Sequence, residues 1–223
     1  KVKLTGNGTY APSLHLQIIE LESDVKKLKN FVRRADKIAH KRDVLLPKWL
    51  PITEQYLKDL TNEKKQIDNP IFSFCIIWLF DIGSYSRAIE YGLIAIEYKQ
   101  TMPPIIKRKW PGFIADTVFE WAETQAESGQ SIEPYFSDVF TRVVNEWALP
   151  EKVTANFYKF AGLALLRKSN GDVTPSHVGD LKRLRQADEF LAKAAEIHKH
   201  AQVKTVRNKI AMRIRAITEL TAS

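Results

Sequence analysis

Cysteine is almost absent from this chain, because Cys75 is the single cysteine among 223 residues. One thiol cannot close an intramolecular disulfide, which excludes the class of small secreted proteins held together by disulfides. Cys75 lies inside the apolar run Ile71–Phe80, so we expect a buried and unreactive thiol. The scarcity of cysteine suits a reducing compartment.

Long apolar runs are missing as well. The run Ile71–Phe80 contains one polar side chain, but it is far shorter than the roughly 20 residues that a membrane-spanning helix needs. No secretory signal precedes the first expected helix, so we expect no membrane partner. A GxxxxGK[ST] phosphate-binding loop is also absent, which argues against ATP hydrolysis by this chain, and we expect no cofactor.

Residues in a catalytic arrangement are not visible in the sequence. The best array of carboxylates is Asp116, Glu120, Glu123 and Glu127, which share one helical face. This spacing is too even for the compact metal cluster of a nuclease, so it favours a solvated face or a contact to basic helices. His198 and His200 are two residues apart and point to different sides of a helix. We therefore predict no catalytic residue and no metal site.

Runs of alternating apolar and polar residues are rare, so the sequence predicts an all-α fold. Short extended pieces are conceivable only at residues 105–106 and 143–144. We expect four segments: a flexible basic tail (1–12), a basic coiled-coil-like helical hairpin (13–66), a central multi-helix domain (67–168) and a C-terminal helical arm (169–223). Helices of the central domain are expected near 70–80, 84–100, 112–128, 134–147 and 151–168. The arm forms either one long helix or a hairpin broken near 198–201.

The strongest periodic feature is an apolar seam near the N-terminus, which predicts one long helix over residues 13–46. Pro47 should end this helix, and residues 47–51 should turn the chain into the second helix of a hairpin. The second helix is the shorter one, so the long helix packs either on another subunit or on the chain's own central domain. The residues expected to support oligomerisation are Leu14, Ile18, Leu21, Val25, Leu28 and Val32.

Positive charge is concentrated at the two ends of the chain. Residues 1–66 carry 14 basic and 8 acidic side chains, whereas residues 67–168 carry 10 and 12. Cations flank the apolar seam and form a second cluster beside Trp110, which either stacks on a partner or anchors its loop to the core. Both clusters suit DNA phosphates, although solvated helix flanks have the same composition. The predicted DNA-binding residues are Lys26, Lys27, Lys29, Arg33, Arg34, Lys37, Lys41, Arg42, Lys107, Arg108 and Lys109.

Residues 70–104 indicate a buried helix, a tight turn at Gly83 and a second helix with a small-residue face. A tetratricopeptide-type hairpin has similar spacing, but no second copy of the unit is present. The segment instead resembles the small terminase subunit of tailed phages that package DNA from cohesive-end (cos) sites, often labelled "terminase, endonuclease subunit". The resemblance covers about 40% of the chain and rests on Trp78, Asp81, Gly83, Tyr85, Ala88, Ala95, Pro103, Lys107-Arg108, Phe113-Ile114-Ala115, Leu149–Ala155, Tyr158-Lys159 and Gly162-Leu163.

The resemblance implies a protein of the host cell cytoplasm that binds double-stranded phage DNA at cos. It further implies a homo-oligomeric ring that presents the DNA to a large terminase subunit, which carries the ATPase motor. Two alternatives stay open. The chain is itself the site-specific endonuclease subunit, or it is a helical scaffold without nucleic-acid binding.

Overall fold

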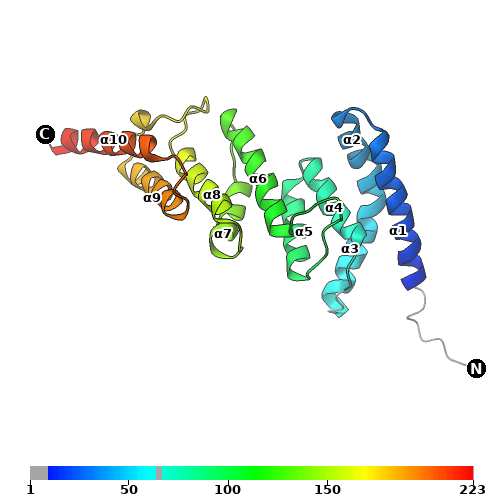
Figure 1. Cartoon of the computed structure of the whole chain (residues 1–223). Helices are drawn as coiled ribbons and strands as arrows, with labels where there is room; N and C mark the ends of the chain where they lie inside the picture. Colours follow the sequence, from blue (N-terminus) through cyan, green and yellow to red (C-terminus); the bar gives the residue numbers. More distant parts are fainter. Residues whose placement is uncertain (1–9, 64–66, 223) are drawn as a thin grey trace, which may run out of the picture. The chain divides into compact units, whose positions relative to one another are not determined.

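The computed structural model describes residues 10–63 and 67–222, and most of these residues are helical (Figure 1). No strand forms in this part of the chain, where one isolated β-bridge joins Arg167 to Val173. The all-α prediction is therefore confirmed. Among the described helices, none is long and apolar enough to cross a membrane. Residues 1–9 of the predicted basic tail lie outside the described residues.

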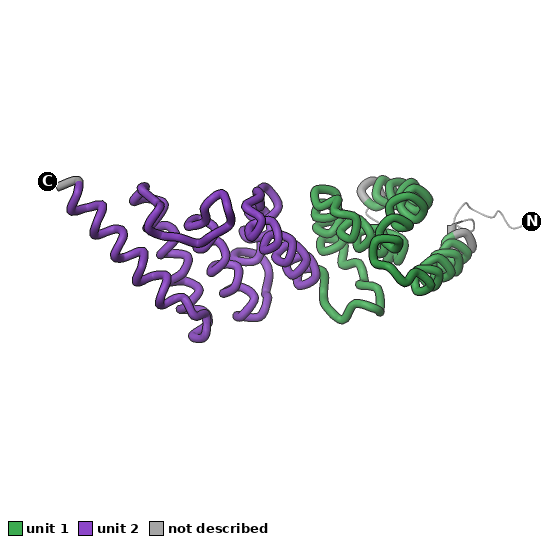
Figure 2. The backbone as a smooth tube through the Cα atoms, turned by 90° about the horizontal axis from the view of Figure 1, so that it is seen from above, with its two compact units in different colours: residues 1–110 green, residues 111–223 purple. Residues whose placement is uncertain are grey.

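The chain divides into two compact units, an N-terminal unit (residues 1–110) and a C-terminal unit (residues 111–223), coloured separately in Figure 2. The division falls inside the segment 67–168 that the sequence groups as a central domain. It coincides with the start of helix α6 (Trp110–Glu127).

The described residues of the N-terminal unit form five α-helices and two short helical segments of other types. In chain order they are α1 (Tyr10–Lys27), the 3-10 turn η1 (Leu28–Asn30), α2 (Arg34–His40), the π-helical segment η2 (Lys41–Leu45), α3 (Leu46–Glu63), α4 (Pro70–Asp81) and α5 (Tyr85–Glu97).

The prediction of one helix over residues 13–46 is wrong. The helix breaks after Lys27, where a 3-10 turn leads into extended backbone at Phe31 and Arg33. A new helical stretch then runs from Arg34 to Glu63 without a turn at residues 47–51. The π-helical turn just before Pro47 explains its tolerance, because a wider turn accommodates a ring that would clash with an α-helical carbonyl. The hairpin therefore turns at residues 28–33 instead.

Helix α4 forms the centre of the N-terminal unit, as its apolar sequence predicts. All its residues from Ile71 to Phe80 are buried except Phe74, which is half-buried. Helices α3 and α5 pack against it. From α3 come the buried side chains of Leu46, Trp49 and Leu60, and from α5 come Ala88 and Ala95. The predicted thiol state also holds, since Cys75 is fully buried and burial raises its pKa to about 12.

The connection between α4 and α5 is a tight turn. Gly83 has a φ of +80°, a conformation that glycine adopts without the steric cost of a Cβ. The Ser84 side chain, which precedes α5, makes no capping hydrogen bond. The cap lies at the start of α4, where the Asn69 side chain accepts hydrogen bonds from the backbone N–H groups of Ile71 and Phe72.

The C-terminal unit contains α6, α7 (Tyr135–Asn145), α8 (Glu151–Ala164), the 3-10 turn η3 (Pro175–His177), α9 (Leu181–Ile197) and α10 (Lys204–Ala222). The break between α9 and α10 decides the open question in favour of a hairpin. Aromatic rings join α6, α7 and α8, and Phe136 lies 4.8 Å from Phe160 between ring centroids. The expected pieces at residues 105–106 and 143–144 are not strands: Val143 lies within α7, and the other pair lies in a loop.

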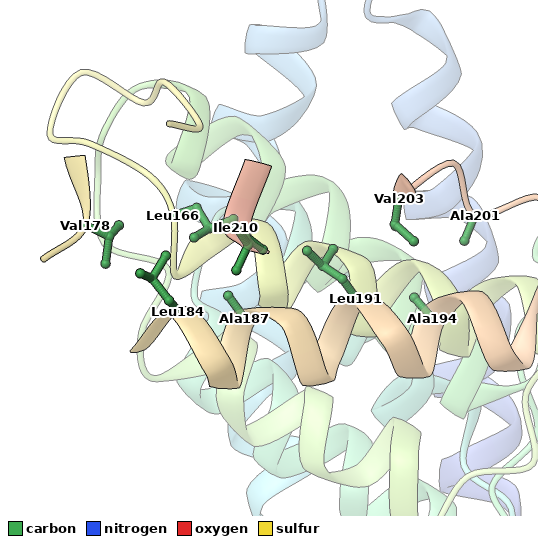
Figure 3. Packing of buried hydrophobic residues seen from close by; sticks show 9 residues of the cluster. All are labelled: Leu166, Val178, Leu184, Ala187, Leu191, Ala194, Ala201, Val203 and Ile210. Carbon is green, nitrogen blue, oxygen red and sulfur yellow. The ribbon is translucent and has the colours of Figure 1, made fainter. Parts of the chain in front are cut away.

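Helix α9 packs closely on α8, and small residues make this possible. A Cβ added to Gly162 would lie 2.8 Å from Leu191 Cγ and 2.9 Å from the Ala187 carbonyl oxygen. Apolar side chains on one face of α9 meet residues of α10 and of the preceding loop (Figure 3). The buried cluster consists of Leu166, Val178, Leu184, Ala187, Leu191, Ala194, Ala201, Val203 and Ile210.

Candidate nucleic-acid interface

The break in the predicted helix gathers cations in the turn between α1 and α2, at the upper right of Figure 1. We call residues 26–34 the cationic turn. No residue from Val25 to Ala35 is acidic. The five cations of the turn sit at the end of α1, in η1 and at the start of α2: Lys26, Lys27, Lys29, Arg33 and Arg34.

Most cations of the turn are exposed and available to a partner. Lys26, Lys29, Arg33 and Arg34 are exposed and make no ion pair with any described residue. Lys27 is also exposed but forms an ion pair with Asp24 at 3.1 Å. Lys37, one turn further along α2, is half-buried and makes no ion pair with the described side chains. Four cations within nine residues thus point to an anionic partner.

The two remaining predicted cations of this region have partners in the chain. Lys41 Nζ lies 2.6 Å from Asp81 Oδ2, and only 15% of its side chain is exposed. Arg42 is exposed, yet it bonds both carboxylate oxygens of Asp43 at 2.8 and 2.9 Å. We therefore place Lys41 outside the candidate interface and give Arg42 a weaker part in it.

Lys107, Arg108 and Lys109 are exposed in the loop before α6. The neighbouring Trp110 anchors this loop, since 3% of the residue is exposed and its Nε1 donates a hydrogen bond to the Gln100 carbonyl at 2.9 Å. Of the two roles considered for Trp110, anchoring is the one observed. The loop therefore presents its cations without an aromatic platform from Trp110.

A buried carboxylate network ties α1 to α3 close to the cationic turn. Asp24 Oδ2 accepts hydrogen bonds from Lys48 Nζ at 2.5 Å and from Trp49 Nε1 at 3.2 Å. Burial opposes ionisation of Asp24, but hydrogen bonds from Lys48, Lys27 and Trp49 outweigh it and hold the pKa of Asp24 below its ordinary value. Within the turn, the Phe31 ring lies 4.9 Å from the ring of His40 at the end of α2. Both contacts fix the turn's position.

The apolar seam is divided by the same break. Leu21 is buried in the N-terminal unit, and Val32 is 96% exposed in the turn rather than on the helix face of the others. The other predicted oligomerisation residues are half-buried: Leu14, Ile18, Val25 and Leu28. Sequence patterning missed Leu16 and Ile19, which are 65% and 51% exposed on α1. Oligomerisation through α1 stays a prediction.

The C-terminal cations divide into bonded and exposed groups. Arg207 pairs with Asp188 through two hydrogen bonds of 2.7 and 3.0 Å, which join α10 to α9. Arg183 and Arg213 donate to the backbone carbonyls of Leu165 and Val178. These three arginines therefore stabilise the unit. Exposed cations there include Lys182 and Arg185 on α9.

The carboxylates of α6 lie as the sequence predicts, along one helix. Glu120, Glu123 and Glu127 are exposed, and Asp116 is half-buried. Burial and the neighbouring charge of Glu127 raise the pKa of Glu123, while Arg167 acts in the opposite direction. Among the described residues, no group of three or more His, Cys, Asp or Glu side chains is arranged to hold a metal ion.

Comparison with known proteins adds independent information. Residues 18–152 match the model of a family described as phage small terminase subunit. A curated relative from Haemophilus phage HP1 (strain HP1c1), "Probable terminase, endonuclease subunit", is 38% identical over 202 residues, which cover 90% of this chain and 70% of the relative. No solved structure matches the chain. The family match includes the whole cationic turn.

Proposed function

This chain belongs to the phage small terminase subunit family, and from that premise we propose that it binds double-stranded phage DNA at the cos site. Family membership gives the chain a role in phage DNA packaging within the host cell. We propose that this role is exercised in the host cytoplasm, where a homo-oligomeric ring of the chain presents DNA to the large terminase subunit.

The observation that carries the DNA-binding proposal is the cationic turn, in which four of the five exposed cations make no ion pair with a described residue. Neutralisation of phosphates by Lys and Arg supplies most sequence-independent affinity for DNA. The charge of the two units supports the same placement. The N-terminal unit has 19 basic and 12 acidic residues, a net charge of +7, whereas the C-terminal unit has 15 and 14, a net charge of +1. We therefore assign DNA contact to the N-terminal unit.

The test is a gel-shift titration with a cos fragment against a scrambled duplex of equal length. The Arg33→Glu/Arg34→Glu variant should lose at least tenfold in affinity and reduce the slope of log affinity against log salt by about 2. The matched control is Lys182→Glu/Arg185→Glu, which makes the same change in net charge on exposed α9 positions. Equal losses in both variants would contradict the assignment to the turn.

A second candidate function is that this chain cleaves the DNA, since its relative is named as an endonuclease subunit. The same titration with and without magnesium separates the two functions. A specific shift without cleavage supports recognition alone. Magnesium-dependent cleavage that disappears in Asp116→Ala/Glu120→Ala makes the chain the nuclease. Absence of any shift leaves a scaffold without nucleic-acid binding.

The ring proposal rests on α1, where half-buried seam residues and the exposed Leu16 and Ile19 leave apolar area on the helix. Apolar side chains that stay exposed in a monomer suit burial against a second copy. Light scattering gives the mass in solution and thus the number of subunits. A monomeric mass at the concentrations that bind DNA would contradict the ring.

A further inference from the structure

Val32 is the most exposed large apolar residue described in the chain, with 96% of its surface accessible. It lies inside the cationic turn, directly before Arg33 and Arg34 and three residues after Lys29. An apolar side chain in this position gains nothing from the fold, because it contacts almost none of it. Its cationic surroundings make an anionic partner with apolar surface the best match.

The backbone around Val32 is extended rather than helical. Phe31 has φ −79° and ψ 121°, and Arg33 has φ −88° and ψ 136°. An α-helix with its side chains is about 10–12 Å across, whereas the minor groove of B-DNA is about 6 Å wide. The extended segment 31–33 is slender enough for the minor groove, and the flanking helices are not.

The side chains of the turn match what the minor groove offers. Its negative potential attracts arginine, most strongly where the groove is narrow. Proteins that bind there also place apolar side chains against or between base steps, which unstacks the bases and bends the duplex. The contact between the tilted rings of Phe31 and His40 holds the segment in place, so that Val32 and the arginines are presented together.

We infer that the cationic turn enters the minor groove of the phage DNA and that Val32 contacts a base step there and bends the duplex. The exposed lysines Lys26 and Lys29 face the flanking phosphates. This inference rests on the proposed DNA binding and specifies its mode, which is recognition of groove shape and deformability. A protein surface is the competing partner for Val32, and the experiment below includes it as an outcome.

The test measures DNA bending by energy transfer between dyes at the two ends of a cos duplex of about 30 base pairs. The full-length parent should raise the transfer efficiency on binding. Val32→Ser should bind with an unchanged salt slope but lose at least half of that rise. Val44→Ser is the control, because Val44 is 47% exposed in the same unit but lies in η2. Circular dichroism confirms that both variants fold.

A groove-specific competition completes the test. A distamycin-type minor-groove ligand should displace the protein, whereas methyl green, which occupies the major groove, should not. Equal bending by the parent and Val32→Ser overturns the inference, as does displacement by methyl green alone. Normal bending by Val32→Ser with lost binding to the large subunit would assign Val32 to a protein partner. A specific gel shift without bending would support the proposed DNA binding and contradict only binding in the minor groove.

Discussion

Asp24 shows how one buried charge can fix the base of an interface. Its carboxylate lies within 3.2 Å of one donor atom from each of Lys27, Lys48 and Trp49. Only 7% of its side chain is exposed, so losing any of these bonds leaves a polar atom without water to replace it. Asp24 thus joins the end of α1 to the first turns of α3, next to the ion pair of Lys48 with Glu20 at 2.7 Å.

Replacing Asp24 by Asn should lower the free energy of unfolding by about 1.5–3 kcal/mol at pH 7, because hydrogen bonds to a charged group are lost. The folded-state pKa of Asp24 lies below its ordinary value of 3.8. Its contribution is therefore fully present above that value and is lost as the pH falls through the folded-state pKa. The difference between parent and variant should accordingly shrink below about pH 4.

Urea titrations at several pH values measure this effect. The exposed Asp36 on α2 provides the control, since Asp36→Asn removes the same charge from a carboxylate without a described partner. A difference between parent and D24N that is independent of pH would show that the charge of Asp24 does not contribute.

At the scale of elements, the continuous helical stretch from Arg34 to Glu63 contains two prolines that the sequence marks as breaks. Pro47 follows the π-helical turn, and Pro51 lies inside α3. Neither proline ends the helix, because tertiary packing of Leu45, Leu46 and Trp49 on the core outweighs the local cost. The element is therefore held by its buried face rather than by its helix propensity.

Replacing the exposed Pro51 by Ala should restore a backbone donor within α3 and raise the free energy of unfolding by up to about 3 kcal/mol. Pro111→Ala, in the first turn of α6, should change the free energy of unfolding by less than about 0.5 kcal/mol. A backbone N–H at this position has no intrahelical carbonyl to bond, so the alanine gains no hydrogen bond. Thermal unfolding measures both. A less stable P51A would mean that the proline itself is required for the packing of α3 on α4.

The sequence predicts best those elements that have a long apolar run or that are bounded by Pro or Gly. Helix α4 follows from its apolar run, and Pro70, Gly83 and Pro150 give boundaries that the structure keeps within one or two residues. The break at residues 28–33 was not predictable from the apolar period, since Leu28, Val32 and Ala35 continue the heptad without interruption. Only Asn30 hinted at a turn, and no Gly or Pro supported it.

The candidate interface was predictable in composition but not in arrangement. The cations of the turn were identified from the sequence, yet a continuous helix would have spread them around its surface. Pairing of Lys41 with Asp81 depends on a contact between residues 40 positions apart, which no local pattern reveals. The role we infer for Val32 follows from its exposure and from the extended backbone around it, whereas its place in the heptad predicted a buried position on the seam.

At the scale of the whole molecule, the chain divides into two compact units. Gly162 belongs to the C-terminal unit, where α8 and α9 approach so closely that a methyl group must displace Leu191 or the Ala187 carbonyl. The carboxylate network of Asp24 lies in the N-terminal unit, and none of its described partners contacts Gly162. Changes at these two places should therefore act independently.

Gly162→Ala should destabilise the C-terminal unit by about 1–3 kcal/mol through overpacking. Native-state hydrogen exchange should then speed up in α8 and α9 while the amides of α3 and α4 keep their protection. Gly112→Ala is the control, since its Cβ would lie 4.0 Å from Leu149 Cδ2, an ordinary contact. Equal acceleration in both units would show that the chain unfolds as one cooperative body.

The buried thiol of Cys75 does not compete with an introduced cysteine for thiol-reactive dyes. Burial raises its pKa to about 12, so the thiol stays protonated at pH 8 and maleimide dyes meet almost no native thiolate. A cysteine introduced at Asn30 would carry the dye at the turn itself. The native sequence thus already provides the cysteine-light chain that single-molecule tracking of a packaging complex requires.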